Sequence, residues 1–130
     1  MSNRAKANPL LLRRVLEELP RFAYRFADEV ELHEGMAQVL TGAGVPFVRE
    51  HIAGPQDRFD FLIDSGIVIE AKVKGSLPPA LQQCARYLDR DDVSVVILAV
   101  TRYWGKAQPE YRSKRTGKSI HTVHLRGASF

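Results

Sequence analysis

The feature that most constrains this 130-residue chain is a pair of short apolar segments, residues 59–63 and 67–73, joined by Asp64-Ser65-Gly66. Both segments are rich in β-branched and aromatic residues, and the connection has turn-forming composition. The pattern therefore predicts a β-hairpin centred on Ser65. In that register Asp60 faces Glu70, and directly opposed side chains of an antiparallel pair have Cβ atoms about 4.5–5.5 Å apart.

Asp60, Glu70 and Lys72 would share one face of this hairpin. Side chains alternate along a strand, so Ile69 and Ala71 take the other face. Two carboxylates this close repel each other unless a cation joins them or one keeps its proton. Carboxylate oxygens suit Mg²⁺ or Mn²⁺, so the hairpin is a candidate metal site. The alternative is a surface hairpin whose polar face merely carries charged residues.

The overall composition is that of one ordinary globular domain, with 45% hydrophobic and 26% charged residues. No apolar run reaches the roughly 18 residues that a membrane-spanning helix needs, and the N-terminal residues lack a signal-peptide core. The single cysteine, Cys84, excludes an internal disulfide and fits a reducing compartment. These features predict a cytoplasmic protein with no membrane contact.

Hydrophobic periodicity predicts helices over residues 9–19, 28–41 and about 79–88, and strands over residues 45–50, 59–63, 67–73, 93–101 and 120–125. Residues 1–8 are interpreted as a disordered tail, and residues 102–118 as a basic loop, with or without a short helix. A helix separates the Lys72 strand from the next strand, which favours a parallel pair. The expected fold is α/β (α+β), a mixed sheet flanked by helices.

The C-terminal third carries most of the excess positive charge. Beyond Thr101 there are seven lysines and arginines and a single acid, Glu110, with Tyr103, Trp104 and Tyr111 among them. A basic segment that bears aromatic residues suits a phosphate backbone, although a solvated basic surface is the alternative. The residues expected to contact nucleic acid are Arg102, Lys106, Arg112, Lys114, Arg115 and Lys118.

From about residue 28 to residue 101 the chain resembles the PD-(D/E)xK nuclease superfamily, in particular its small resolvase-like or repair-like members. The matching motif is Asp60 followed by Glu70-Ala71-Lys72, with Phe59 where the motif has proline. The resemblance implies a restriction-endonuclease-like core within a single domain, residues 9–130. It implies that Asp60 and Glu70 bind one or two Mg²⁺ (or Mn²⁺). Lys72 would orient or activate the attacking water and stabilise charge on the phosphate.

The resemblance also implies an acidic residue on the first core helix. Glu31, His33 and Glu34 are alternatives for this position. Counting back from Gly44, His33 is the closest match to the resolvase-like members of the superfamily, with Glu34 beside it; His33 could also be a water-activating base if the acid was replaced. Glu31 and Glu34 lie three residues apart on one helical face and could act together.

Two more residues complete the candidate site. Many members of the superfamily carry a glutamine on the helix after the Glu-x-Lys strand, and Gln83 matches that position. Arg58 lies two residues before Asp60 on the same strand face; if the hairpin extends that far it faces Lys72 and could contact a DNA phosphate.

The resulting expectation is a metal-dependent deoxyribonuclease that hydrolyses phosphodiester bonds in DNA, an endonuclease rather than an exonuclease. The chain is too small for a separate sequence-reading domain, which favours structure- or end-directed cleavage in DNA repair or recombination. A homodimer is expected, since nucleases that cut two strands often act in pairs. The alternatives are a non-catalytic nucleic-acid-binding module with the same fold and a small α+β domain with no nucleic-acid role.

Overall fold

The computed structural model describes residues 4–102 and 110–128 as an α/β fold. The helices are α1 (Pro9–Glu18), α2 (Glu29–Gly42) and α3 (Leu77–Leu88), with short 3₁₀ turns at η1 (Leu19–Arg21) and η2 (Asp64–Gly66). The strands are β1 (Phe47–Ile52), β2 (Arg58–Ile63), β3 (Ile67–Lys72), β4 (Val95–Val100), β5 (Glu110–Arg112) and β6 (Ser119–His124). Within the described ranges they form a six-stranded mixed sheet of order β1-β2-β3-β4-β6-β5.

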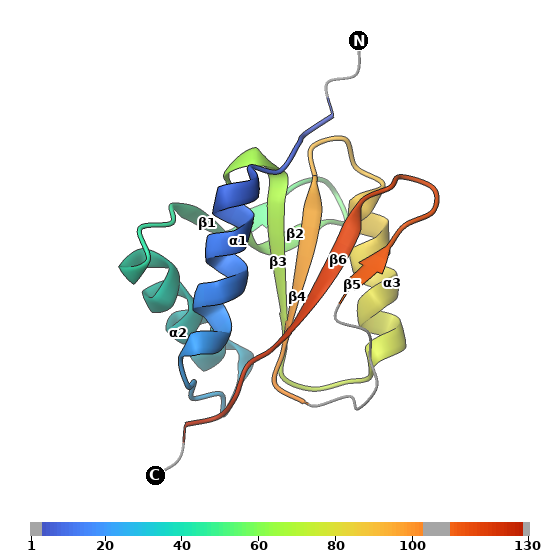
Figure 1. Ribbon diagram of the computed structural model, residues 1–130. Helices are drawn as coiled ribbons and strands as arrows, with labels where there is room; N and C mark the ends of the chain where they lie inside the picture. Colours follow the sequence, from blue (N-terminus) through green and yellow to red (C-terminus); the bar gives the residue numbers. More distant parts are fainter. Residues whose placement is uncertain (1–3, 103–109, 129–130) are drawn as a thin grey trace.

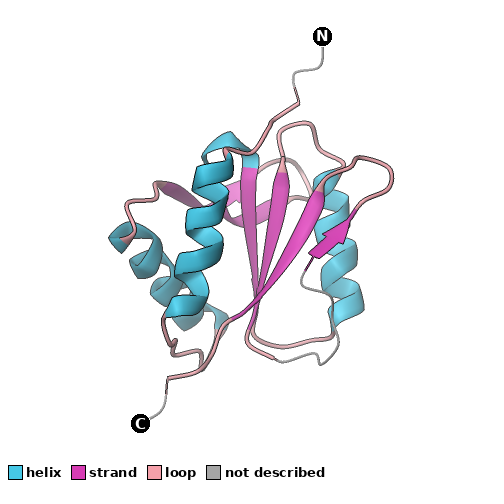
Figure 2. Ribbon diagram, in the orientation of Figure 1, coloured by secondary structure: helices cyan, strands magenta, loops and turns pink. Residues whose placement is uncertain are grey.

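Helices cover both faces of this sheet, with α1 and α2 on one face and α3 on the other (Figures 1 and 2). Side chains of β3 divide between the two layers as the predicted alternation requires. Ile67, Ile69 and Ala71 pack in the cluster under α1 and α2, whereas Val68 packs in the cluster under α3. Glu70 lies two residues after Val68, so its side chain is on the same face of β3, toward α3.

Local capping accounts for the first two helices, both of which the sequence predicted. Asn8 Oδ1 accepts from the N–H groups of Leu10 and Leu11 at the start of α1. At the start of α2, Asp28 accepts from the N–H of Glu31, and the Glu31 carboxylate accepts from the N–H of Ala27. This reciprocal capping satisfies helix-end donors that would otherwise lack a partner.

The predicted hairpin register is confirmed. Phe61 pairs with Ile69 and Ile63 with Ile67, around a turn in which Ser65 has φ 64° and Gly66 has φ 77°. A Cβ at Gly66 would also lie 2.6 Å from the carbonyl oxygen of Asp92, so this position requires glycine.

The parallel pairing of β3 with β4 is confirmed, and β6 also runs parallel to β4. Several details differ from the sequence prediction: α3 begins at Leu77 rather than at about residue 79, and β4 spans Val95–Val100 rather than residues 93–101. The first strand begins at Phe47 rather than Val45, directly after Pro46, which cannot donate to a ladder. The basic stretch expected to be a loop contains β5, a three-residue edge strand antiparallel to β6.

The first three residues of the expected tail lie outside the described residues. Between Arg4 and Asn8 the chain is neither helix nor strand, but it contacts the domain: the Ala5 N–H donates to Asp91 O, and the Asn8 N–H donates to Ser65 Oγ. Among the described residues, no helix has the length and apolar character needed to cross a membrane.

Candidate active site

The β2–β3 ladder opens at the two predicted carboxylates. Backbone pairing between these strands runs from Ile63 to Phe61. Beyond it, side chains replace the backbone: the Asp60 N–H donates to Glu70 Oε1 at 3.3 Å, and the Ala71 N–H donates to Asp60 Oδ2 at 2.8 Å. The two acids therefore lie in the seam between the strands, where the register predicted that they would meet.

Both carboxylates are shielded from water, with 9% of Asp60 and 2% of Glu70 exposed. Burial raises the pKa of Glu70 to about 8; the charge of Asp60 acts in the same direction, and the Lys72 ammonium acts against both. Without a cation, Glu70 is therefore expected to keep its proton near neutral pH.

His33 is the α2 residue that reaches this pair. Its ring is buried, and its Nε2 lies 3.5 Å from Asp60 Oδ2. Among the buried side-chain nitrogen and oxygen atoms of the described residues, this Nε2 lacks a hydrogen-bond partner. Interaction with Asp60 raises the pKa of His33, although burial acts in the opposite direction. An imidazole nitrogen in this position is available to a proton, a water molecule or a metal ion.

The two glutamates that were alternatives to His33 lie elsewhere. Glu31 is exposed and caps the start of α2. Glu34 is exposed and pairs with Arg49 of β1 at 2.7 Å, rather than with the carboxylates of the seam. The structure therefore brings His33, and neither glutamate, to the Asp60–Glu70 seam.

Lys72 lies at the end of β3 and is partly exposed. Its positive charge lowers the pKa of Glu70, which shows that the ammonium acts on the seam. Arg58 does not pair with Lys72, because the β2–β3 ladder has already opened. Arg58 pairs instead with Ile52 of β1, and its side chain is exposed.

On the α3 side, a hydrogen-bond chain runs beside Glu70 and ends on the backbone of β2. Gln83 Nε2 donates to the Tyr87 hydroxyl at 3.0 Å, and that hydroxyl donates to the backbone carbonyl of Arg58 at 3.1 Å. Burial and then the charge of Glu70 raise the pKa of Tyr87 to about 12, which places the phenol beside the carboxylate. Gln83 thus reaches the site through Tyr87. Sequence reasoning missed Tyr87, although its spacing of four residues from Gln83 was a usable signal.

Glu50 is a second residue whose role sequence reasoning did not predict. It stands opposite Asp60 between two formed β1–β2 pairs, and its backbone is left-handed, with φ 51°. A regular strand would turn Phe59 and Phe61 to the same face. Here Phe61 packs under α1 and α2, and Phe59 packs under α3. This break in the strand turns the Asp60 side chain toward the N–H of Ala71.

We therefore expect the backbone of Glu50 to control the position of Asp60. Glu50→Gly and Glu50→Asn tolerate a left-handed backbone, whereas Glu50→Val does not. Glu50→Val should destabilise the fold by about 1–3 kcal/mol and move the His33 pKa toward its ordinary value. NMR titration of His33 measures the effect. All three variants remove the same charge, so an identical His33 titration in all three would contradict this expectation.

The basic residues expected to bind nucleic acid are divided between two ends of the sheet. Arg102 is exposed just after β4, at the Lys72 end. Lys106 lies outside the described residues. The remaining four lie in β5 or in the connection to β6, at the end where β4 begins (Figure 1): Arg112, Lys114, Arg115 and Lys118.

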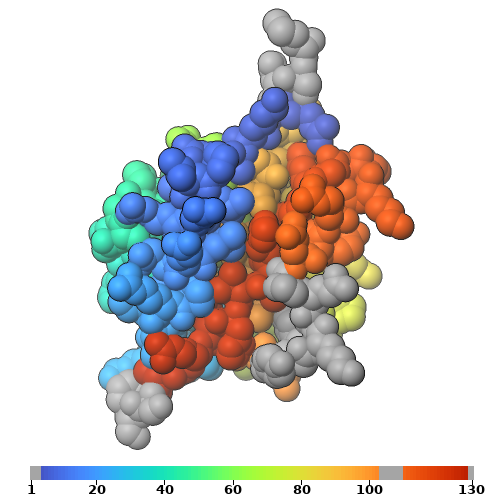
Figure 3. All heavy atoms as spheres, viewed as in Figure 1, coloured from blue at the N-terminus to red at the C-terminus, as the bar shows by residue number. Residues whose placement is uncertain are grey.

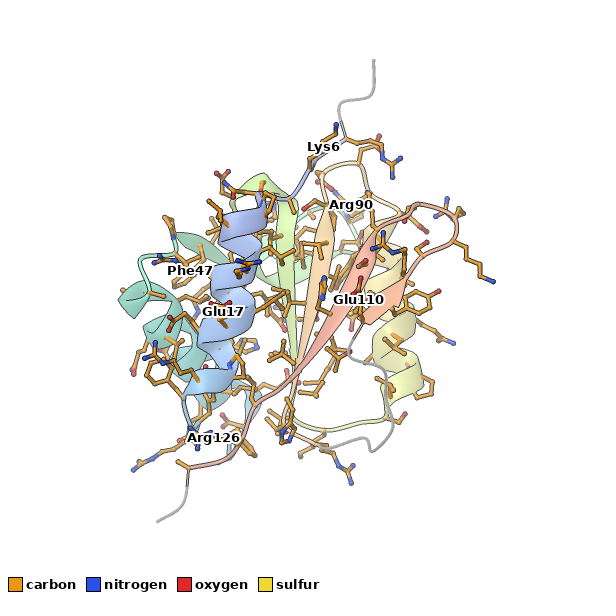
Figure 4. All side chains as sticks on the ribbon, in the orientation of Figure 1. Lys6, Glu17, Phe47, Arg90, Glu110 and Arg126 are labelled. Carbon is orange, nitrogen blue, oxygen red and sulfur yellow. The ribbon has the colours of Figure 1, made fainter. Side chains whose placement is uncertain are left out.

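Lys118 has a structural role at that far end. Its Nζ donates to the carbonyl oxygens of Leu88 and Arg90 at 3.1 and 2.7 Å, where α3 ends. Figure 4 shows Arg90 at this end of the sheet and Arg126 at the opposite end. Lys118 is therefore directed toward the protein rather than toward a surface ligand.

Within residues 4–102 and 110–128, no three histidine, cysteine, aspartate or glutamate side chains are arranged as a ready set of metal ligands. Two features of the seam nevertheless fit a cation. Burial, and then repulsion between the two carboxylates, raises the pKa of Glu70, and the His33 Nε2, which has no hydrogen-bond partner, faces Asp60.

No family model and no curated protein matches this chain. It is similar to a chain in a solved structure titled as a refined half-complex from the tetradecameric assembly of Thermococcus gammatolerans McrB AAA+ hexamers with bound McrC. The TM-score is 0.54 at 15% identity, over 79% of the present chain and 30% of that chain. This likeness concerns the fold alone, and the present chain spans about a third of that neighbour's length.

Proposed function

We propose that this protein is a metal-dependent deoxyribonuclease with a restriction-endonuclease-like core. The observation that carries the proposal is the buried pair Asp60 and Glu70 in the open seam between β2 and β3. Burying two acids side by side costs free energy, so their position calls for a physical explanation. Binding a hard divalent cation is the simplest one.

Asp60 and Glu70 would hold Mg²⁺ or Mn²⁺, with His33 Nε2 as a further donor beside Asp60. A cation in the seam would lower the pKa of a bound water and neutralise phosphate charge. Lys72, at the partly exposed end of β3, would face the negative charge that develops on the phosphate. Tyr87 and Gln83 would hold the Glu70 side of the seam.

The second candidate is a non-catalytic nucleic-acid-binding module. It is favoured by the finding that the described residues contain no ready set of three metal ligands. In this case Glu70 would keep its proton, the acids of the seam would have a structural role, and the basic surface would bind the nucleic acid.

A supercoiled-plasmid nicking assay with Mg²⁺, Mn²⁺ or EDTA tests the proposal. We expect cleavage that requires metal and that disappears in Asp60→Ala. Calorimetry of Mn²⁺ binding to wild type and Asp60→Ala accompanies it. Absence of both nicking and metal binding in the wild-type chain would leave the binding module as the better interpretation.

A further inference from the structure

A basic groove lies outside the candidate active site, between α3 and the connection of β5 to β6. Its volume is about 580 Å³. Four basic side chains, one acid and one aromatic ring line it: Arg86, Arg112, Lys114, Arg115, Asp89 and Tyr111. In Figure 3 the connection that forms one wall stands out from the body of the molecule.

The three arginines of the groove are held by ion pairs at the surface, and Arg112 also donates to the backbone carbonyl of Gly117. Arg86 pairs with Asp57, Arg112 with Glu110, and Arg115 with Asp89. More than half of each arginine side chain is exposed. Exposed ion pairs contribute little to stability, so these guanidinium groups can exchange their partners for a phosphate.

Tyr111 adds a surface for stacking. It lies on the short edge strand β5, and 48% of it is exposed. An exposed ring among basic side chains is the combination that binds single-stranded nucleic acid: the cations follow the backbone and the ring stacks on a base. In a duplex the bases are already stacked on one another and do not present their faces to such a ring.

The groove and the candidate active site lie on different sides of α3. Gln83 and Tyr87 of this helix face the seam, whereas Arg86 and Asp89 line the groove. An α-helix with its side chains is about 10–12 Å across. A ligand that occupies both regions must pass around α3, so it is a polymer rather than a mononucleotide.

We propose that this groove binds a single-stranded segment of nucleic acid. As a statement about substrate, this rests on the proposed function: the nuclease would act on DNA that carries a single-stranded tail or flap. The groove would hold the tail, and the seam on the other side of α3 would hold the scissile phosphate.

Fluorescence anisotropy with labelled oligothymidylates of roughly 4 to 16 nucleotides, in EDTA, tests the groove without cleavage. Tyr111→Leu should weaken binding by about 5- to 150-fold, and Tyr111→Phe should bind as wild type does. Arg86→Gln combined with Lys114→Gln should reduce the slope of log affinity against log salt by about 1.4. Arg13→Gln combined with Lys6→Gln, which removes the same charge elsewhere, should leave that slope unchanged.

Three results would contradict the proposal that the groove binds single-stranded nucleic acid. They are equal affinity of Tyr111→Leu and Tyr111→Phe, equal salt slopes for the two double variants, and tighter binding of a duplex of the same length. Melting curves identify any variant that fails to fold. A chain that binds through the groove but never cleaves DNA contradicts the nuclease proposal alone. If the wild-type chain cleaves DNA and the groove variants bind and cleave as the wild type does, the result contradicts the groove proposal alone.

Discussion

Glu70→Gln is expected to abolish cleavage and, at the same time, to stabilise the metal-free protein at alkaline pH. Glutamine keeps an oxygen that can accept from the Asp60 N–H but carries no negative charge. Loss of a ligand for the cation should lower the cleavage rate by roughly 10²–10³-fold or more. An ordinary destabilising mutation cannot produce this combination, because it would lower stability and activity together.

The sign of the stability change follows from the pKa of Glu70. Its ordinary value is 4.5, and the folded protein raises it to about 8. Between these values the folded state binds more protons than the unfolded state, so stability falls as the pH rises through this window. Each unit of difference corresponds to about 1.4 kcal/mol. The raised pKa of His33 acts in the same direction, because its contribution is lost as the pH rises through the folded value.

Thermal unfolding in EDTA across this pH window measures the effect. The wild type should lose stability as the pH rises, and Glu70→Gln should lose less. Mn²⁺ should raise the melting temperature of the wild type but not that of Glu70→Gln, since a ligand of the folded state stabilises it. Glu17→Gln, on the exposed side of α1, is the matched control and should behave as wild type. A wild-type melting temperature that does not change over the window would contradict the raised pKa of Glu70.

Lys72→Met is expected to lower single-turnover cleavage by about 10²-fold or more while leaving metal binding in place. The reason is that the ammonium would stabilise charge on the phosphate and is not a ligand of the cation. Lys72→Arg should restore little activity, because a guanidinium is bulkier and its charge is more spread out. The raised pKa of Glu70 should rise further in Lys72→Met, since the lysine charge now opposes it.

Lys74→Met provides the matched control. Lys74 is exposed beyond the end of β3, and its replacement should change neither cleavage nor metal affinity. Metal affinity is best compared above the pKa of Glu70, where the Glu70 carboxylate is ionised. Wild-type cleavage by Lys72→Met would remove Lys72 from the mechanism and weaken the nuclease proposal as a whole.

Sequence reasoning predicted the hairpin because its determinants are local. The turn at Ser65 and Gly66 needs residues that tolerate positive φ, and the alternation of β3 allows only one register that buries Ile67 and Ile69. The cap at Asp28 fixed the start of α2 for the same reason. The meeting of Asp60 and Glu70 followed directly from this register.

The same reasoning could not choose among Glu31, His33 and Glu34. That choice depends on the rotation of α2 about its axis, which the packing of Leu32 and Met36 against the sheet decides. The edge strand β5 was also missed, because its three exposed residues have no apolar pattern and form a strand only beside β6.

The chain order of apolar and turn-forming residues was thus sufficient to predict the two facing acids and the lysine beside them. Tertiary packing decided the rest of the site: His33 at Asp60, Tyr87 at Glu70, and the left-handed Glu50 opposite Asp60. It also separated the basic connection before β6 from the seam, which composition cannot reveal. The physical reason is that a strand or turn follows from neighbours in sequence, whereas convergence of side chains from different elements follows from long-range packing.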